Sequence, residues 1–370
     1  MNERNLLMIP GPIEFEPAVL RAMGEKTRSH LDPVFMKSFS RTLTRLREVF
    51  AAPSAQPFVV AGSGTLAMEM AVANLVQPGD KALVVNSGYF SDRIAAMLER
   101  HGATVTHVRA EPGAIASVEE VERALAGGGF KVMTITHVDT STAVLAPVKE
   151  LAAVGRKHGA LVVVDGVCSV GGEALEMDAW GVDVTFTASQ KALGAPPGLA
   201  VLLAGPRAMA AWKARTRPVA SMYLDFTEWL PIHEAYEAEK PAYYATPAVN
   251  SIMALDVSLG QLLEEGMAAR VQRHERIAAH VNRAWKALGL EVLPRSEAVR
   301  AHTLSAVYYP AGVDAALVKA IAQEGVVVAG GLHSALKTKY FRVGHMGAVS
   351  MNDVTATLGA IERALASLKR

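Results

Sequence analysis

The sequence of 370 residues contains a single cysteine, Cys168. This excludes an internal disulfide framework and a metal site built from several cysteines. No stretch approaches the roughly 20 apolar residues that a membrane-spanning helix requires. The first dozen residues also lack the apolar core of a secretory signal, so we expect a cytoplasmic protein. Lysine and arginine number 37 against 36 aspartate and glutamate. Without a basic block, nothing indicates a nucleic-acid-binding or anionic-membrane surface.

What the sequence does have is the length and composition of a well-packed enzyme. It is 51% apolar and 20% charged, and its length allows one large core and a second, smaller one. Between residues 58 and 205, short β-branched runs such as KALVVN and LVVVD alternate with helical stretches. Many runs are apolar on both faces, as in strands covered by helices on each side. The pattern predicts an α/β fold with a mostly parallel, doubly wound sheet.

The pattern changes after Pro247. Residues 248–289 read as a long helical stretch, which we expect to bend or break near Gly260 and Gly266. Short strands and two further helices follow, which indicates a small α+β domain. We therefore predict an N-terminal segment contributing to the active site over 1–20, a large domain over 21–250, and a small C-terminal domain with a long connecting helix over 251–370.

The stretch AGSGTLAMEMAVANL, residues 61–75, reads as a strand end, a turn and an apolar helix. Backbone N–H groups at a helix start suit a phosphate, and the hydroxyls of Ser63 and Thr65 can add contacts. An ordinary tight turn is the simpler alternative. The letters GSGTLA also fit the dinucleotide fingerprint, which expects an acidic residue at the end of the next strand. That strand ends in Asn86, which weakens a nicotinamide-dependent oxidoreductase as an alternative function.

Two charged residues follow neighbouring strands at the same predicted sheet edge. Asp165 ends the apolar run LVVVD, and Lys191 stands in TASQKALGAPPG, residues 187–198. Each has an ordinary interpretation, since most such aspartates accept loop amides and most lysines are solvated. A phosphate cradle, a carboxylate for a protonated ring nitrogen, and a lysine are together what pyridoxal 5′-phosphate needs. The sequence therefore predicts a site for this cofactor beyond the carboxyl ends of the strands, where open α/β sheets bind their ligands.

On these motifs the chain resembles the class V, fold-type I pyridoxal-phosphate aminotransferases. The resemblance is greatest to the alanine–glyoxylate and serine–glyoxylate (serine–pyruvate) group. It runs nearly end to end, and the lysine motif with its Gly-Ala-Pro-Pro-Gly tail is highly specific. The other shared stretches, in the family's order, are IPGPIEFEPAVLRAM, AGSGT, THVDTSTAVL, VDGVCSVGG, YYATPAV and FRVGHMG.

The resemblance implies a role for each matching position. Lys191 would bond covalently to the cofactor and then move the proton, and Asp165 would pair with the pyridine nitrogen. Thr140 would lie near the ring oxygen, and Phe90 would stack on the ring where many relatives have Trp. Thr65 stands where some members have His. The residues expected at the phosphate are Ser63, Gly64, Thr65 and Gln190.

The resemblance also implies a homodimer with shared active sites, because Tyr243 and Thr246 match a pair that reaches the phosphate of the other subunit. Arg342 would clamp the substrate's α-carboxylate, as a planar guanidinium can, and the Gly11 backbone would line the same pocket. The implied reaction moves the amino group of alanine, or of serine, to glyoxylate. Other transaminases of the family, such as one for 2-aminoethylphosphonate, are alternatives that would need further cations in the pocket.

Three remaining residues receive ordinary interpretations. Cys168 is not expected to transfer sulfur, since desulfurases of this fold type carry their cysteine shortly before the carboxylate-binding arginine. The stretch GGLHSALKTKYFR has none there, so Cys168 is expected to be packed. His274 and His280 are six residues apart, which does not suit a metal pair on one helical face, and we expect both to be solvated. We predict no metal site.

Overall fold

The computed structural model describes residues 5–368, so the first four residues of the expected N-terminal segment lie outside it. Its centre is a seven-stranded sheet in which every neighbouring pair is parallel except those of β10. The strands coincide with the apolar runs of the sequence, and the predicted doubly wound architecture is confirmed. In sheet order they are β2 (Gln56–Ala61), β10 (Leu199–Ala204), β9 (Val184–Ala188), β8 (Leu161–Asp165), β5 (Phe130–Thr136), β3 (Lys81–Asn86) and β4 (Thr104–Arg109).

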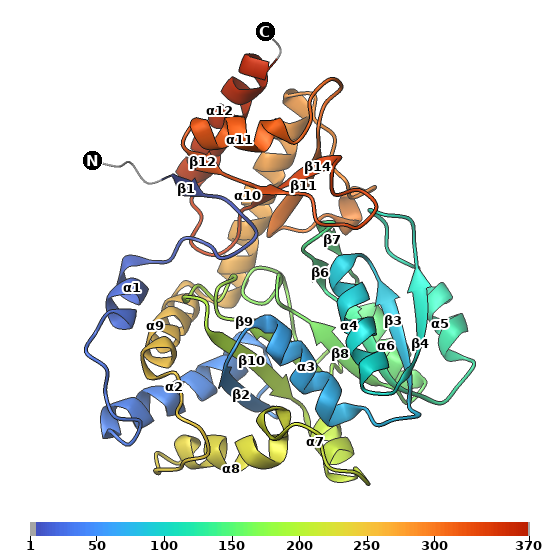
Figure 1. Ribbon diagram of the computed structural model, residues 1–370, viewed down its shortest axis with the longest axis vertical. Coiled ribbons are helices and arrows are strands. Elements are labelled where there is room, and N and C mark those ends of the chain that lie inside the picture. The colour runs from blue at the N-terminus through green and yellow to red at the C-terminus, as the bar shows by residue number, and fades with distance from the viewer. Residues whose placement is uncertain (1–4, 369–370) are drawn as a thin grey trace.

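Helices cover both faces of this sheet (Figure 1). Successive strand residues point to opposite faces, so Val163 packs with one helix layer and Val164 with the other. One layer contains α3 (Gly64–Leu75), α4 (Tyr89–Arg100) and α7 (Pro206–Lys213). The other contains α2 (Pro33–Val49), α5 (Val118–Leu125), α6 (Val148–Lys157) and α9 (Val249–Glu265). Helix α8 (Phe226–Glu237) contributes to both cores, and α1 (Pro17–Met23) packs against α9.

The long helical stretch divides at Gly266, whose φ of 82° is readily adopted only by glycine. Helix α9 ends there and α10 (Met267–Ala287) begins. A bend or break is expected near Gly260 as well, but the helix does not break there, because α9 continues through this residue. A Cβ at Gly260 would lie 3.2 Å from the Arg45 guanidinium, so this glycine permits the close approach of α2. Helix α9 thus packs with the large domain, although the predicted division at residue 250 places it in the small one.

The small domain is built on a three-stranded antiparallel sheet of β11 (Leu304–Tyr308), β14 (Tyr340–Gly344) and β13 (Ala329–Gly330). Helices α10, α11 (Ala316–Gln323) and α12 (Met351–Leu368) share its core. The N-terminal strand β1 (Leu6–Leu7) pairs with β12 (Val326–Val327), and Met8 lies in the same core. Two short strands, β6 (Val138–Asp139) and β7 (Val144–Leu145), form a hairpin below β14.

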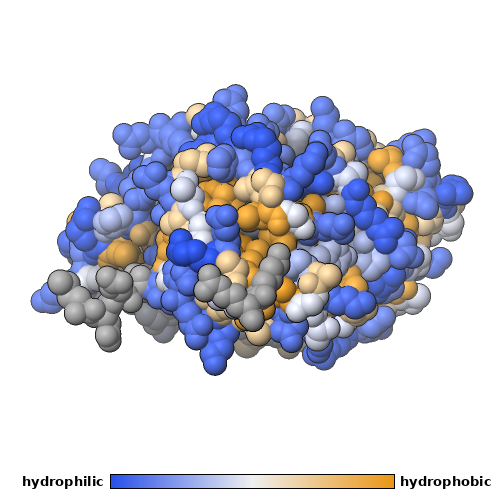
Figure 2. Space-filling model, turned by 90° about the horizontal axis from the view of Figure 1, so that it is seen from above, coloured by the Kyte–Doolittle hydropathy of each residue, from blue (hydrophilic) through white to orange (hydrophobic). Residues whose placement is uncertain are grey.

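Seen from the end that carries the small domain, the surface is mainly hydrophilic, with a hydrophobic area near its centre (Figure 2). Half-buried Leu6, Val318 and Leu358 pack on the small-domain core, so its apolar packing extends close to the surface. Among residues 5–368, no helix has the length and apolar character to cross a bilayer.

Candidate active site

Asp165 and Lys191 lie at the carboxyl ends of adjacent parallel strands. Asp165 is the last residue of β8 and is paired in register with Phe186 of β9. Lys191 follows the end of β9 by three residues. Lys191 lies on the loop between β9 and β10, residues 189–198, which we call the lysine loop. This loop is held internally, since Gly194 N donates to the Lys191 carbonyl at 2.8 Å. The two residues are therefore brought to one edge of the sheet, the edge at which open α/β sheets bind ligands.

Lys191 is only 9% exposed, and the N-terminal segment covers it. Its ammonium group donates to the Pro10 carbonyl. Gly11 has a φ of 119°, and a Cβ there would lie 2.6 Å from both Cδ and Nζ of Lys191. The Ile13 N–H donates to the Gln190 carbonyl at 3.3 Å. The structure thus brings Gly11 to Lys191, and only a residue without a side chain fits between them.

Asp165 is a buried carboxylate, 3% exposed. Its Oδ1 accepts a hydrogen bond from Val167 N at 2.9 Å. Burial raises its pKa to about 7, the Val167 bond opposes this rise, and the negative charge of Asp139 adds to it. The positive charge of Lys191 acts in the lowering direction. A further cation against this carboxylate, such as a protonated ring nitrogen, would lower its pKa and keep it ionised.

The start of α3 fits a phosphate group. Ser63 is the N-cap residue, and among the described residues its hydroxyl makes no capping bond, while its side chain and that of Thr65 are exposed. A Cβ on Gly64 would lie 3.0 Å from Val167, so the backbone here sits close to the Asp165 loop. The buried Oε1 of Gln190 has no hydrogen-bond partner within residues 5–368. These polar groups and the N-terminus of α3, which together we call the α3 cradle, suit an anion.

The loop after β5 carries Thr140 and a residue that sequence reasoning did not single out, Asp139. Asp139 is fully buried, and burial raises its pKa. Its carboxylate accepts from the backbone N–H groups of Phe90 at 3.2 Å and Ser91 at 3.4 Å, at the start of α4, and from both N–H and hydroxyl of Ser141. Asp139 thereby fixes the backbone of the predicted stacking residue, Phe90, beside Thr140.

Arg342 comes from the small domain but reaches this loop. Its Nε donates to the Gly330 carbonyl at 2.8 Å, and its Nη1 donates to the Thr140 carbonyl at 3.2 Å. Burial lowers its pKa from the usual arginine value, as expected for a desolvated cation. The structure thus joins Arg342 to Thr140 across the domain boundary.

Cys168 is buried as expected, and burial raises the pKa of its thiol.

Tyr243 and Thr246 lie apart from these groups. Both are exposed, Tyr243 at 65%, and the Tyr243 ring lies 5.5 Å from that of His30. Within the described part of the chain, no hydrogen bond, ion pair or ring contact joins either residue to Lys191 or the α3 cradle. Their expected contact with the phosphate of a second subunit stays a prediction.

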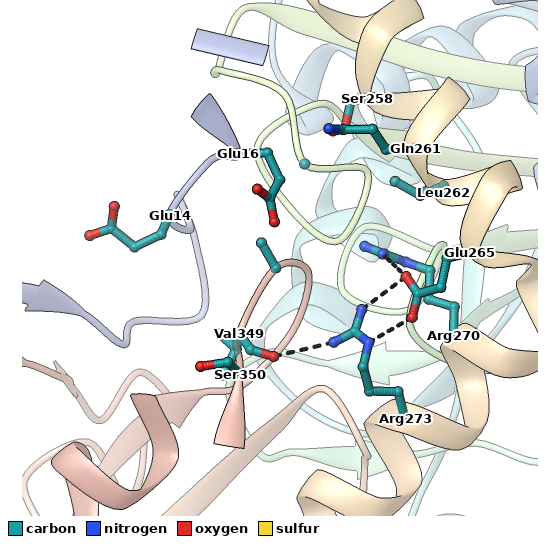
Figure 3. A pocket seen from close by; sticks show the side chains of 12 residues that line it. Glu14, Glu16, Ser258, Gln261, Leu262, Glu265, Arg270, Arg273, Val349 and Ser350 are labelled. Carbon is teal, nitrogen blue, oxygen red and sulfur yellow. Dashed lines mark hydrogen bonds and ion pairs between the residues drawn. The ribbon is translucent and has the colours of Figure 1, made fainter. Parts of the chain in front are cut away.

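Behind the lysine loop lies a charged group that we call the Glu265 cluster, consisting of Glu265, Arg270 and Arg273 (Figure 3). Arg270, 5% exposed, donates to Glu265 at 2.7 Å, to the Gly171 carbonyl at 2.7 Å and to the Ala192 carbonyl at 2.9 Å. Arg273 donates to Glu265 at 2.6 Å. The cluster therefore holds the loop that follows Asp165 and the residue after Lys191.

The same cluster reaches the segment that follows Arg342. Arg273 donates to the Gly347 carbonyl at 2.9 Å and to the Val349 carbonyl at 3.2 Å. His274 accepts from Gly347 N at 3.0 Å through Nε2. The expectation that His274 is solvated is wrong: it is fully buried, and burial lowers its pKa to about 3. Its neutral ring joins α10 to the small-domain loop, whereas His280 is half-buried.

The described residues contain no group of three or more His, Cys, Asp or Glu placed to bind a metal ion.

A sequence model of the family described as Aminotransferase class-V matches residues 19–356. The chain belongs to this family. Class V aminotransferases use small amino and oxo acids, and the family implies pyridoxal phosphate as cofactor. A nicotinamide-dependent oxidoreductase is therefore no longer a candidate.

Named class V relatives show how far the likeness extends. Alanine–glyoxylate aminotransferase 1 of Saccharomyces cerevisiae is 40% identical over 94% of this chain and 93% of its own. L-aspartate–glyoxylate aminotransferase of Paracoccus denitrificans is 34% identical over 97% and 90%. The crystal structure of alanine–glyoxylate aminotransferase from Nostoc sp. superposes with a TM-score of 0.93 at 33% identity, covering 99% of this chain and 96% of that one.

Sequence reasoning missed Asp139, Arg93 and the Glu265 cluster. Asp139 lies within THVDTSTAVL, a stretch that carried the resemblance, and Arg93 lies three residues after Phe90, for which the resemblance implies a stacking role. The available signal for Asp139 was a single carboxylate in a stretch whose neighbouring polar residues, Thr140, Ser141 and Thr142, are uncharged. Little distinguishes Arg270 locally from its neighbours on α10, because the two carbonyls that it holds lie 78 and 99 residues away in the chain.

Proposed function

We propose that this enzyme transfers the amino group of alanine to glyoxylate, giving pyruvate and glycine, with pyridoxal 5′-phosphate as cofactor. The observation that carries the proposal is the placement of Lys191 and buried Asp165 on adjacent strand ends beside the start of α3. The names of the yeast and Nostoc relatives favour alanine as donor. The Paracoccus relative is named for aspartate, so the donor is the feature that most needs a direct test.

The residues at this edge fit the parts of the cofactor one by one. Ser63, Gly64, Thr65 and Gln190 would hold the phosphate, with help from the dipole of α3. Phe90 would lie on one face of the ring, and Thr140 would lie near its ring oxygen. When bound, pyridoxal phosphate supplies an aldehyde for a covalent bond to an amine and a ring that draws electrons from the substrate's α-carbon.

Lys191 would link to the cofactor and, once displaced by substrate, serve as the base for the α-proton. Its ammonium already lies against the Pro10 carbonyl, in a site from which most water is excluded. Asp165 would keep the ring nitrogen protonated through its negative charge. Arg342 would hold the substrate's α-carboxylate with the N–H groups that Gly330 and Thr140 do not use. Gly11 leaves room beside the lysine.

We further propose a cytoplasmic homodimer in which Tyr243 and Thr246 of one subunit reach the cofactor phosphate of the other. Their exposure within a single chain supports this assignment, since a large exposed aromatic such as Tyr243 suits an interface. A serine donor, or 2-aminoethylphosphonate in a pocket with additional cations, remains the alternative within the family.

The decisive experiment is the visible spectrum of the purified protein incubated with pyridoxal phosphate. We expect an absorption band that L-alanine bleaches and glyoxylate restores. L-serine, L-aspartate and 2-aminoethylphosphonate are tested in parallel, and a band bleached by one of these but not by alanine would change the donor. Lys191→Ala should fold, form no such band and show no transamination. Retained turnover in that variant would overturn the mechanism.

A further inference from the structure

Arg93 lies between two parts of the candidate cofactor site that are distant in sequence. It stands one helical turn after the first residue of α4, and its guanidinium carbon lies 5.0 Å from the ring centres of both Tyr89 and Phe90. Its Nη1 donates to Thr65 Oγ1 at 3.1 Å, and its Nη2 donates to the Tyr89 hydroxyl at 3.1 Å. One side chain thus connects the α3 cradle to the predicted stacking residue.

No carboxylate in residues 5–368 forms an ion pair with Arg93; at longer range its positive charge acts to lower the pKa of Asp165. The acidic residue beside it in sequence, Asp92, instead pairs with Arg109 at 2.6 Å and accepts from Asn86 at 2.9 Å. Arg93 is half-buried, and its bonds to Thr65 and Tyr89 use two of the five N–H groups of a guanidinium. A partly desolvated cation with free donors therefore faces the cradle.

The cradle itself lacks such a charge. The residues expected at the phosphate, Ser63, Gly64, Thr65, Gln190, Tyr243 and Thr246, are all uncharged side chains or glycine. A phosphate monoester carries a charge of about −1.5 to −2 at neutral pH, and burying it without a cation is costly. A guanidinium can meet phosphate oxygens with two parallel N–H groups. Thr65 already accepts from Arg93, which leaves the Thr65 hydroxyl hydrogen free to donate to the phosphate.

We propose that Arg93 binds the phosphate of pyridoxal phosphate and, through the same guanidinium, holds Phe90 against the cofactor ring. The proposal rests on the function proposed above. It predicts that the phosphate contributes to affinity mainly through Arg93, and that losing the side chain weakens ligands with a phosphate more than ligands without one.

The test measures binding to the cofactor-free protein by equilibrium titration, with pyridoxal phosphate and with pyridoxal, which lacks the phosphate. In Arg93→Met we expect the Kd for pyridoxal phosphate to rise about tenfold or more, the scale of a lost charge-assisted hydrogen bond. The Kd for pyridoxal should rise much less. Inorganic phosphate should compete with pyridoxal phosphate in the wild type and compete more weakly in the variant. Arg93→Lys, which keeps a point charge but not the planar fork, should fall between.

The matched control is Arg100→Met, an exposed arginine on the same helix, which should leave both Kd values unchanged. A Thr65→Val change combined with Arg93→Met should cost less than the two single effects added, because the two side chains share one hydrogen bond. If Arg93→Met does not fold, as judged by circular dichroism, the comparison is made with Arg93→Lys and Arg93→Gln.

The outcomes separate the inference from the function on which it rests. A wild type that binds neither ligand would refute the proposed function and leave nothing for Arg93 to bind. A wild type that binds normally, with Arg93→Met unchanged, would refute the inference alone. Equal weakening of pyridoxal and pyridoxal phosphate would show that Arg93 only orients Phe90, and the phosphate contact would be wrong.

Discussion

Replacing Arg270 by methionine should destabilise the protein and loosen its lysine loop without removing any group expected to touch substrate. The guanidinium is 5% exposed and donates to Glu265 and to the carbonyls of Gly171 and Ala192. Methionine replaces the aliphatic stem with a flexible apolar chain, so the change mainly removes the charge and the hydrogen bonds. Two buried carbonyls lose a donor, and one carboxylate loses its most buried partner.

The magnitude follows from the burial of the two charges. Removing one partner of a buried ion pair costs about 3–5 kcal/mol. The Glu265 side chain is 27% exposed and keeps Arg273, which places the expected loss near the lower end, about 3 kcal/mol. For large domains, 1 kcal/mol corresponds to roughly 2–4 °C. We expect the midpoint of thermal unfolding to fall by about 6–12 °C.

The assay is differential scanning calorimetry of the cofactor-free protein, with kcat measured alongside. Arg276→Met, an exposed arginine further along α10, is the control and should change neither quantity. The melting temperature of Arg273→Met should lie between those of Arg270→Met and Arg276→Met. This change removes the donor to the Gly347 and Val349 carbonyls and leaves the Ala192 carbonyl bonded. A melting temperature for Arg270→Met equal to that of Arg276→Met would refute the reasoning that the cluster stabilises the junction.

Three further predictions concern residues nearer the chemistry. Gly11→Ala places a Cβ 2.6 Å from Cδ and Nζ of Lys191 at a φ of 119°, so kcat should fall about 100-fold or more. The control Gly24→Ala, where a Cβ makes only ordinary contacts, should leave kcat unchanged in the same assay. The Asp165 pKa rises on folding from 3.8 to about 7, so its contribution to the stability of the cofactor-free protein is present below about pH 4 and is lost as the pH rises through 7. The melting temperature of wild type relative to Asp165→Asn should therefore drop between about pH 4 and pH 7, and parallel curves would contradict this burial argument. Arg342→Ala should raise KM for α-amino acids at least tenfold or so, in steady-state kinetics, with an unchanged KM moving the carboxylate site elsewhere.

The central strands were predictable because they are buried on both faces and therefore form continuous apolar runs, as LVVVD does before Asp165. Their order was not, because nothing within LAVLLAG shows that β10 runs against both of its neighbours. A glycine in a helical stretch can end the helix, as Gly266 does, or it can leave room for a neighbouring side chain, as Gly260 does for Arg45. The sequence alone does not show which of the two roles a glycine has. Only the packing of α9 on α2 distinguishes the two.

The candidate site divides in the same way. Lys191 and Asp165 were identifiable because a charge at the end of an apolar strand is unusual in itself. Arg93, Asp139 and Arg270 are not unusual locally; each is polar on an element with a polar face or edge, and each acquires its partners through tertiary contacts. His274 was misread for this reason, because its partner, Gly347, lies 73 residues further along the chain.

Some long-range contacts of the candidate site cross the boundary between the two domains. The N-terminal segment pairs with β12 of the small domain and then donates and accepts hydrogen bonds at the lysine loop through Ile13 and Pro10. Arg342 reaches from β14 to the Thr140 carbonyl. Arg270 joins α10 to the Gly171 and Ala192 carbonyls of the large domain.

The covered lysine and the Thr140 contact of Arg342 therefore exist only while the small domain is seated on the large one. Removing Pro10 and Gly11 from Lys191 would admit water to its ammonium group. Separating β14 from the loop of Thr140 would take Arg342, proposed to bind the substrate carboxylate, away from the lysine proposed to move the proton. Substitutions at the junction that spare every reacting group should consequently lower kcat as well as stability. Substitutions that lower the melting temperature equally but lie in the sheet core away from the site should lower stability and leave kcat unchanged, because these contacts stay in place.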